Sequence, residues 1–80
     1  MFTVYILFSP SSGKHYYGYT SDINKRLVEH NSGLSNFTSK YIPWELIYSE
    51  TFATRSEAMK REKFFKSYNG YKWLKDNHII

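Results

Sequence analysis

TVYILFSPSSGKHYYGY, residues 3–19, decides the fold, because two runs of β-branched and aromatic residues flank a turn-forming segment. We predict a β-hairpin here. A loop of about five residues would place Tyr5 within about one residue of lying opposite Tyr16 across the antiparallel ladder. Two tyrosine side chains are therefore expected to meet on one face of a sheet.

A helix is expected directly after the hairpin. Ser21 or Asp22 can cap a helix through Ile23, Leu27 and His30, and Asn31-Ser32-Gly33 would end it. Arg26 and His30 are four residues apart, so both side chains lie along one flank of this helix, at the edge of its apolar stripe.

A long polar loop from Leu34 to Pro43 leads to a third strand. The loop contains Asn36, Thr38, Ser39 and Lys40. The strand, Trp44 to Phe52, alternates, which predicts Trp44, Leu46 and Tyr48 on one side and Glu45, Ile47 and Ser49 on the other. This strand would complete a small sheet.

The last third of the chain is predicted to be helical. Thr54-Arg55-Ser56-Glu57 is a capping box that opens a helix running to about Tyr68. Asn69-Gly70 is expected to break it before a short terminal helix, whose Trp73 and Leu74 dock on the core. The prediction is one domain over residues 1–80, an α+β fold of order β-β-α-β-α-α with a three-stranded antiparallel sheet flanked by helices.

Composition excludes several function classes. The 80 residues contain no cysteine, which rules out disulfides, thiolate zinc sites and cysteine nucleophiles and is compatible with a cytoplasmic location. No stretch approaches the roughly 18 apolar residues of a membrane span. The net charge is +4, and seven of the eleven Lys and Arg lie from Arg55 onward. A basic, aromatic-rich region suits DNA, although a solvated helix face explains the same charge.

Glu62 is the most informative single position. On a helix its neighbours would be Ala58, Met59 and Phe65, all apolar. A carboxylate that faces a core should be paired or bound to a metal, because an uncompensated buried charge costs several kcal/mol. The structural alternatives are a pair with Arg26 or a position on the rim of the core.

Four further side chains have both a chemical and an ordinary explanation. The fork of Arg26 can grip phosphate oxygens, and His30 can shuttle a proton near neutral pH. An arginine stem can also simply cover apolar surface, a histidine can cap a helix end, and Tyr5 and Tyr16 can be strand formers. Taken together with Glu62, they form the inventory that phosphodiester cleavage needs.

In this order the residues resemble the GIY-YIG nuclease superfamily. The matching pieces are Thr3-Val4-Tyr5, Tyr16-Tyr17-Gly18, Arg26, His30-Asn31-Ser32-Gly33, Pro43-Trp44, and Ala58 to Glu62-Lys63 with Lys66. The ordered set covers nearly the whole chain and resembles the short, stand-alone branch related to the N-terminal nuclease domain of excinuclease. The resemblance implies a three-stranded antiparallel sheet surrounded by helices, with the active site across the hairpin and the first helix.

The resemblance also implies a role for each site residue. It makes Glu62 the single metal ligand from the protein, Arg26 the phosphate clamp, Tyr16 the general base and Tyr5 its hydrogen-bonded companion. His30 stands where relatives carry Tyr or His. The expected cofactor is a divalent ion, Mg²⁺ or Mn²⁺. A tyrosine phenol has a reference pKa of about 10, so nearby cations must favour its phenolate if it is to take a proton from water.

Two positions depart from the family pattern. Thr3 replaces the usual first glycine of the motif, and Tyr19 stands where several relatives have a lysine beside the phosphate. Lys14, Lys25 or a basic residue of the second long helix could supply that cation. The late asparagine used by some relatives has no clear counterpart.

The resulting prediction is a DNA endonuclease directed by DNA structure rather than sequence, with DNA repair or recombination as its setting. Its expected partners are DNA and a further protein, with the chain a monomer or weak dimer. The predicted DNA contacts are Tyr19, Lys25, Lys40, Arg61 and Lys66. One alternative is a non-catalytic nucleic-acid-binding module on the same scaffold. Another is a protein-interaction domain that uses Tyr71, Trp73 and Ile79-Ile80.

Overall fold

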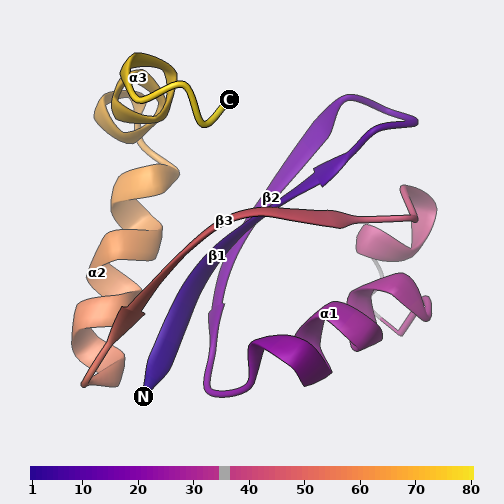
Figure 1. The fold of residues 1–80 in the computed structure, drawn as a ribbon, viewed down its shortest axis with the longest axis horizontal. Helices are drawn as coiled ribbons and strands as arrows, with labels where there is room; N and C mark the ends of the chain where they lie inside the picture. The colour runs from indigo at the N-terminus through magenta and orange to yellow at the C-terminus, as the bar shows by residue number, and fades with distance from the viewer. Residues whose placement is uncertain (35–36) are drawn as a thin grey trace.

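The computed structural model describes residues 1–34 and 37–80, and it confirms the predicted α+β fold and element order (Figure 1). The predicted loop residue Asn36 lies outside the described residues. In chain order the elements are β1 (Phe2–Ser9), β2 (Lys14–Thr20), α1 (Ile23–Asn31), the 3-10 turn η1 (Thr38–Lys40), β3 (Glu45–Phe52), α2 (Arg55–Phe65) and α3 (Tyr68–Asp76). The sheet is antiparallel, with strand order β2-β1-β3.

The central strand β1 separates two cores, because its alternate side chains point to opposite faces of the sheet. Val4 and Ile6 pack on one face, and we call this cluster, with Ala58, Phe65 and Leu74, the α2 core. Tyr5 and Leu7 pack on the other face, and we call this cluster, with Trp44, the α1 core. In Figure 1, α1 and α2 accordingly lie on different sides of the sheet.

The hairpin forms as predicted, but its register differs by about one residue from the expected range. Leu7 lies opposite Tyr16, and Tyr5 lies opposite Gly18. The predicted pairing of the two tyrosines was therefore wrong, because the connection is closed by a tight turn in which the amide of Gly13 donates to the Ser9 carbonyl at 2.8 Å. Both rings still share one face, with centroids 6.3 Å apart.

Gly18 makes room for Tyr5. A Cβ at Gly18 would lie 2.6 Å from the Tyr5 hydroxyl oxygen and 2.8 Å from the carbon that carries it. The Tyr5 side chain therefore crosses directly over β2, which is possible only where that edge strand has no side chain.

A β-bulge changes the faces of β3. The pairing with β1 shifts between Ile6 and Leu7, so that Ile6 faces Tyr48 while Leu7 faces Leu46. Leu46 thus lies on the α1 side and is 40% exposed, whereas Tyr48 packs against the α2 core. The predicted alternation, with both residues on one face, was wrong because a bulge inserts one extra residue into a strand.

The helix caps follow the sequence closely at two of three starts. The Asp22 side chain accepts from the Lys25 amide at 3.1 Å, and Thr54 accepts from the Glu57 amide at 3.2 Å. Gly33, with φ of 83°, follows the end of α1. These caps fix where α1 and α2 begin relative to the sheet.

The break between the last two helices was predicted in the wrong place. Helix α2 ends at Phe65, and Ser67 caps α3 by accepting from the Gly70 amide at 3.2 Å. A Cβ at Gly70 would lie 1.9 Å from the Phe64 carbonyl oxygen. Gly70 is therefore a close-packing residue inside α3 and not a helix breaker. Leu74 is fully buried, as predicted. None of the helices in residues 1–34 and 37–80 has the length and apolarity to cross a membrane.

Candidate active site

A chain of hydrogen bonds links three elements on the α1 side of the sheet. The Tyr5 hydroxyl lies 3.0 Å from Nε2 of His30, and Nδ1 of His30 lies 2.9 Å from Oγ1 of Thr38. All three residues are buried, with His30 2% exposed. The sequence predicted Tyr5 and His30 as neighbours in one site, and the structure brings them into direct contact.

The loop after α1 is held in place by Asn31 and Trp44. The Asn31 side chain accepts from the Trp44 amide at 2.6 Å and donates to the Trp44 carbonyl at 3.1 Å. The Trp44 indole donates to the Thr38 carbonyl at 2.8 Å. These bonds fix Thr38 beneath His30. Sequence reasoning missed Thr38, because a threonine in a polar loop gives no signal of burial.

Tyr16 completes the aromatic part of the site. Its ring centroid lies 4.8 Å from that of His30 and 6.3 Å from that of Tyr5. Tyr16 is half-buried, in contrast to Tyr5, which is 2% exposed. Of the two phenols, Tyr16 is therefore the more accessible to solvent and to a substrate.

The environment favours the neutral forms of Tyr5 and His30. Burial raises the pKa of Tyr5, as does the neighbouring Tyr16, while Arg26 opposes the shift. Burial also lowers the pKa of His30, and the positive charge of Arg26 lowers it further, against a smaller opposing effect of Glu29. A neutral imidazole has one N–H, so a proton donated by Tyr5 to Nε2 requires Nδ1–H to donate to Thr38.

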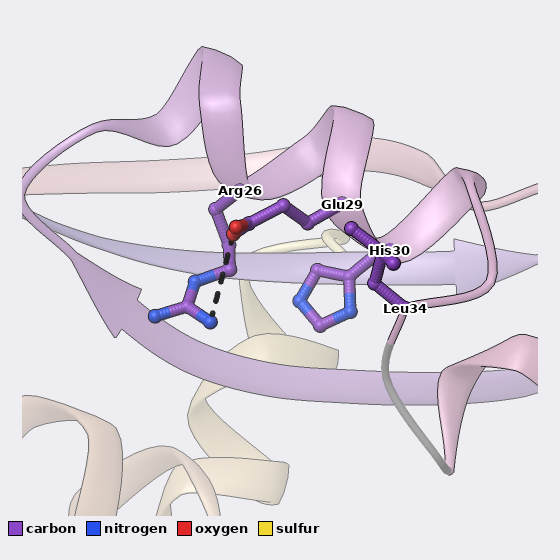
Figure 2. Close-up of a pocket in the computed structure, with 4 residues that line it drawn as sticks. All are labelled: Arg26, Glu29, His30 and Leu34. Carbon is purple, nitrogen blue, oxygen red and sulfur yellow. Dashed lines mark ion pairs between the residues drawn. The ribbon is translucent and has the colours of Figure 1, made fainter.

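Arg26 lies beside His30 at the surface. Figure 2 shows both side chains extending to the same side of α1, next to Glu29 and Leu34. These four residues line a hollow of about 240 Å³. The Arg26 side chain is 46% exposed, and its nearest carboxylate oxygen, on Glu29, is 3.9 Å away. Such a long, exposed pair is weak and leaves most guanidinium N–H groups available to an anion.

Glu62 reaches the site from α2, on the other side of the sheet. Its side chain is only 19% exposed, and its carboxylate accepts from Nζ of Lys66 at 3.1 Å. Its negative charge is among the effects that raise the pKa of Tyr5. The predicted structural alternative, a pair with Arg26, is replaced by the pair with Lys66.

The fit of a divalent metal rests on this one carboxylate. In residues 1–34 and 37–80, no three His, Cys, Asp or Glu side chains gather into a metal site. Mg²⁺ is commonly held by one or two carboxylates, with water and substrate phosphate filling its other positions. Glu62 offers hard oxygen atoms of that kind. The residues therefore fit Mg²⁺ bound by a single protein ligand.

The predicted DNA contacts fall into two groups. Lys25 and Lys40 are exposed, and Lys25 lines a second hollow that shares Arg26 with the first. Lys66 pairs with Glu62, and the Tyr19 hydroxyl accepts from Nε of Arg55 at 3.2 Å. These four residues remain predictions.

Arg61 was a wrong prediction as a DNA contact. Its Nε and Nη2 donate to both oxygens of Glu50, at 2.7 and 3.1 Å. Its guanidinium carbon lies 4.7 Å from the ring centroids of Phe64, Phe65 and Trp73. A cation that is bidentately paired and surrounded by rings contributes to packing and has little left to offer a phosphate.

Comparisons with known proteins agree with this geometry. A family model described as the GIY-YIG catalytic domain matches residues 1–74. A UPF0213 protein of Staphylococcus epidermidis is 42% identical over 66 residues, which cover 81% of this chain and 80% of that protein. A UPF0213 protein of Bacillus pumilus is 46% identical over 70 residues, covering 86% and 69%. The solution NMR structure of a UPF0213 protein from Bacillus halodurans is 32% identical, with a TM-score of 0.56, and the match covers 95% of this chain and 84% of that one.

Proposed function

The chain belongs to the GIY-YIG catalytic domain family, and we propose that it is a divalent-metal-dependent endonuclease that hydrolyses phosphodiester bonds in DNA. The GIY-YIG family is a family of nucleases. One observation carries the proposal: the buried Tyr5–His30–Thr38 chain ends beside an accessible phenol, Tyr16, and an exposed guanidinium, Arg26. A fold that needed only stability would gain nothing from leaving such groups open to solvent.

Arg26 is the phosphate clamp in this mechanism. Its exposed fork can donate two N–H groups to the non-bridging oxygens and stabilise the charge that develops as the phosphorus becomes pentacovalent. The adjoining hollow, lined by His30 and Leu34, gives the phosphate access.

Tyr16 is the general base. Because burial raises the pKa of Tyr5, that phenol keeps its proton and serves to hold His30 in position. Tyr16 is half-buried and next to His30, so it takes the proton of the attacking water. The water then attacks in line with the leaving 3′ oxygen.

Glu62 would hold the divalent ion, with Mg²⁺ or Mn²⁺ as the candidates. When bound, the ion supplies positive charge that offsets the charge developing on the phosphate and on the leaving oxygen. Lys66, which already pairs with Glu62, keeps the carboxylate in place from its solvent side.

We further propose that the substrate is recognised by DNA structure rather than by base sequence. Affinity would come mainly from contacts of lysine and arginine with phosphates, and would fall steeply with salt. A cytoplasmic location, a role in repair or recombination, a protein partner and a monomeric or weakly dimeric state are parts of the same hypothesis.

The first experiment is a cleavage assay on flapped, branched and single-stranded DNA with Mg²⁺ or Mn²⁺. Glu62→Gln should lower the cleavage rate at least about 10²-fold, because a neutral amide binds the ion weakly, while DNA binding and the melting temperature stay near those of the wild type. Glu45→Gln is the matched control, since Glu45 is an exposed glutamate on β3. Cleavage by Glu62→Gln at the wild-type rate would rule out the mechanism.

A non-catalytic DNA-binding module is the second candidate, and the Glu62–Lys66 pair favours it. At 3.1 Å the ammonium already neutralises the carboxylate that the metal needs. An NMR titration with Mg²⁺ distinguishes the two functions before any substrate is known. Shifts at Glu62 and Tyr16 support the nuclease, whereas DNA binding with neither metal-induced shifts nor cleavage supports the module.

A further inference from the structure

Three aromatic side chains form a row that leads away from Tyr16 to the surface. The ring of Phe37 lies 6.2 Å from that of Tyr16 and 5.4 Å from that of Tyr41. Tyr41 in turn contacts Trp44 edge to face, at 6.4 Å. We call Tyr16, Phe37 and Tyr41 the aromatic row. Phe37 is 49% exposed although it stands at the centre of this row.

The position of Phe37 is fixed by the site itself. Phe37 directly precedes Thr38, which is completely buried and hydrogen-bonded to His30. The Trp44 indole holds the Thr38 carbonyl. An exposed ring on such an anchored turn is held in place before any ligand arrives, which lowers the entropy cost of binding against it.

Positive charge borders the aromatic row. Nζ of Lys14 lies 5.2 Å from the centre of the Tyr41 ring, and Lys40 is exposed within η1. Single-stranded nucleic acid is bound by this combination, in which bases stack on aromatic faces and lysines neutralise the flanking phosphates. An aliphatic or acidic partner would use only one of the two features.

We propose that the aromatic row is a stacking site for an unpaired nucleobase, with Phe37 as the platform. The bases of a duplex are already stacked on each other, so only an unpaired or splayed base can lie on Phe37. The proposal rests on the proposed function in one respect: it makes DNA with an unpaired nucleotide next to the scissile phosphate the preferred substrate.

The chain contains a matched control for Phe37. Tyr71, on α3, is 48% exposed, and Nζ of Lys75 lies 5.6 Å from its ring centre. Exposure and an adjacent lysine are therefore alike at both positions. Helix α3 packs on the α2 core, on the side of the sheet away from Tyr16. An effect that needs the aromatic row should be absent at Tyr71.

The test is fluorescence anisotropy with a labelled single-stranded oligothymidine and a blunt hairpin duplex, in EDTA so that nothing is cut. Phe37→Ala should weaken single-strand binding about 10-fold and change duplex binding less than about twofold. Phe37→Leu keeps apolar bulk without a flat face and should behave like Phe37→Ala, whereas Phe37→Trp should restore binding. Tyr71→Ala should leave both affinities unchanged.

Two results would overturn the stacking site. Either Phe37→Leu binds the single strand as tightly as the wild type, or Tyr71→Ala loses as much single-strand affinity as Phe37→Ala. A cleavage assay on the same variants separates this proposal from the nuclease. Binding that depends on Phe37 without any cleavage sustains the stacking site and refutes the nuclease, and cleavage with binding indifferent to Phe37 does the opposite.

Discussion

The two sides of the sheet each carry a cluster of tyrosine with charged or titratable groups, and the clusters differ in how they end. On the α2 side, the Tyr48 hydroxyl donates to Glu50, which is paired with Arg61. On the α1 side, Tyr5 bonds to His30, and the nearest guanidinium, Arg26, is exposed. The first cluster is closed on itself, whereas the second opens to solvent.

The pKa values of the closed cluster show how strongly its members depend on each other. Burial acts to raise the pKa of Glu50, but the hydrogen bonds from Arg61 and Tyr48 lower it below its usual range. Burial and the bond to Glu50 raise the pKa of Tyr48 to about 12. Every charge in this cluster has a partner, which is the arrangement expected of a stabilising group.

The comparison teaches that an arginine's role is set by its surroundings. The Arg61 side chain is 27% exposed and surrounded by three rings, whereas that of Arg26 is 46% exposed beside a hollow. The two sides of the sheet should therefore respond to mutation in opposite ways, with loss of activity on the α1 side and loss of stability on the α2 side.

The largest expected effect is on the α1 side. Arg26→Ala should reduce DNA cleavage about 10³-fold, because it removes the group that stabilises the transition-state charge. The free energy of unfolding should change by less than about 0.5 kcal/mol, since the residue is exposed and its ion pair with Glu29 is long. Single-turnover cleavage and urea denaturation measure the two quantities.

The matching result for Arg26 should come from Arg26→Lys. A lysine keeps the charge but not the planar fork, so it should recover only part of the activity. Full activity in Arg26→Ala would show that the open cluster is not a phosphate site.

The second prediction concerns the closed cluster. Glu50→Gln leaves the half-buried Arg61 without its counter-charge and should lower the free energy of unfolding by about 2 kcal/mol. The cleavage rate at a temperature where the variant is folded should stay within about twofold of the wild type, because Glu50 lies on the side of the sheet away from Tyr16. Urea denaturation and the cleavage assay test this.

Glu45→Gln again provides the control, as an exposed glutamate on the same strand that should change the unfolding free energy by less than about 0.5 kcal/mol. Equal destabilisation by both substitutions would mean that the Glu50–Arg61 pair has no special weight. A large loss of cleavage in folded Glu50→Gln would mean that the two sides are coupled.

Much of the fold could be predicted because its signals are local. The turn after β1, the Asp22 cap and the Thr54 capping box act between residues close in sequence. The errors came from contacts between distant segments. The bulge that turns Tyr48 to the α2 side depends on pairing with β1, and the role of Gly70 depends on the approach of α3 to Phe64.

The site was predictable in its residue types and less so in its architecture. The resemblance named Tyr5 and His30, which the structure joins by one hydrogen bond. It could not separate Arg26 from Arg61, because both are helix arginines and only their tertiary neighbours differ. Thr38 was invisible for the same reason, since its burial arises from Trp44 and His30.

The smallest effect expected is a pH dependence of stability that originates at His30. Its pKa is lowered by burial and by Arg26, against Glu29. An unfolded histidine takes up a proton below its reference pKa of about 6.5, whereas folded His30 resists protonation until a lower pH. The contribution to stability is therefore complete above about pH 6.5 and is lost as the pH falls through the folded pKa.

Urea denaturation at a series of pH values between about 7 and 5 can isolate this effect. Burial and Lys75 lower the pKa of His15 as well, so both histidines give stability the same pH dependence, and the comparison must be made in His15→Gln. In that background His30→Gln should flatten the decline of the unfolding free energy toward acid, by less than the loss in Glu50→Gln. If the decline is unchanged, His30 is not the buried, neutral link between Tyr5 and Thr38, and the open cluster on the α1 side has lost its central member.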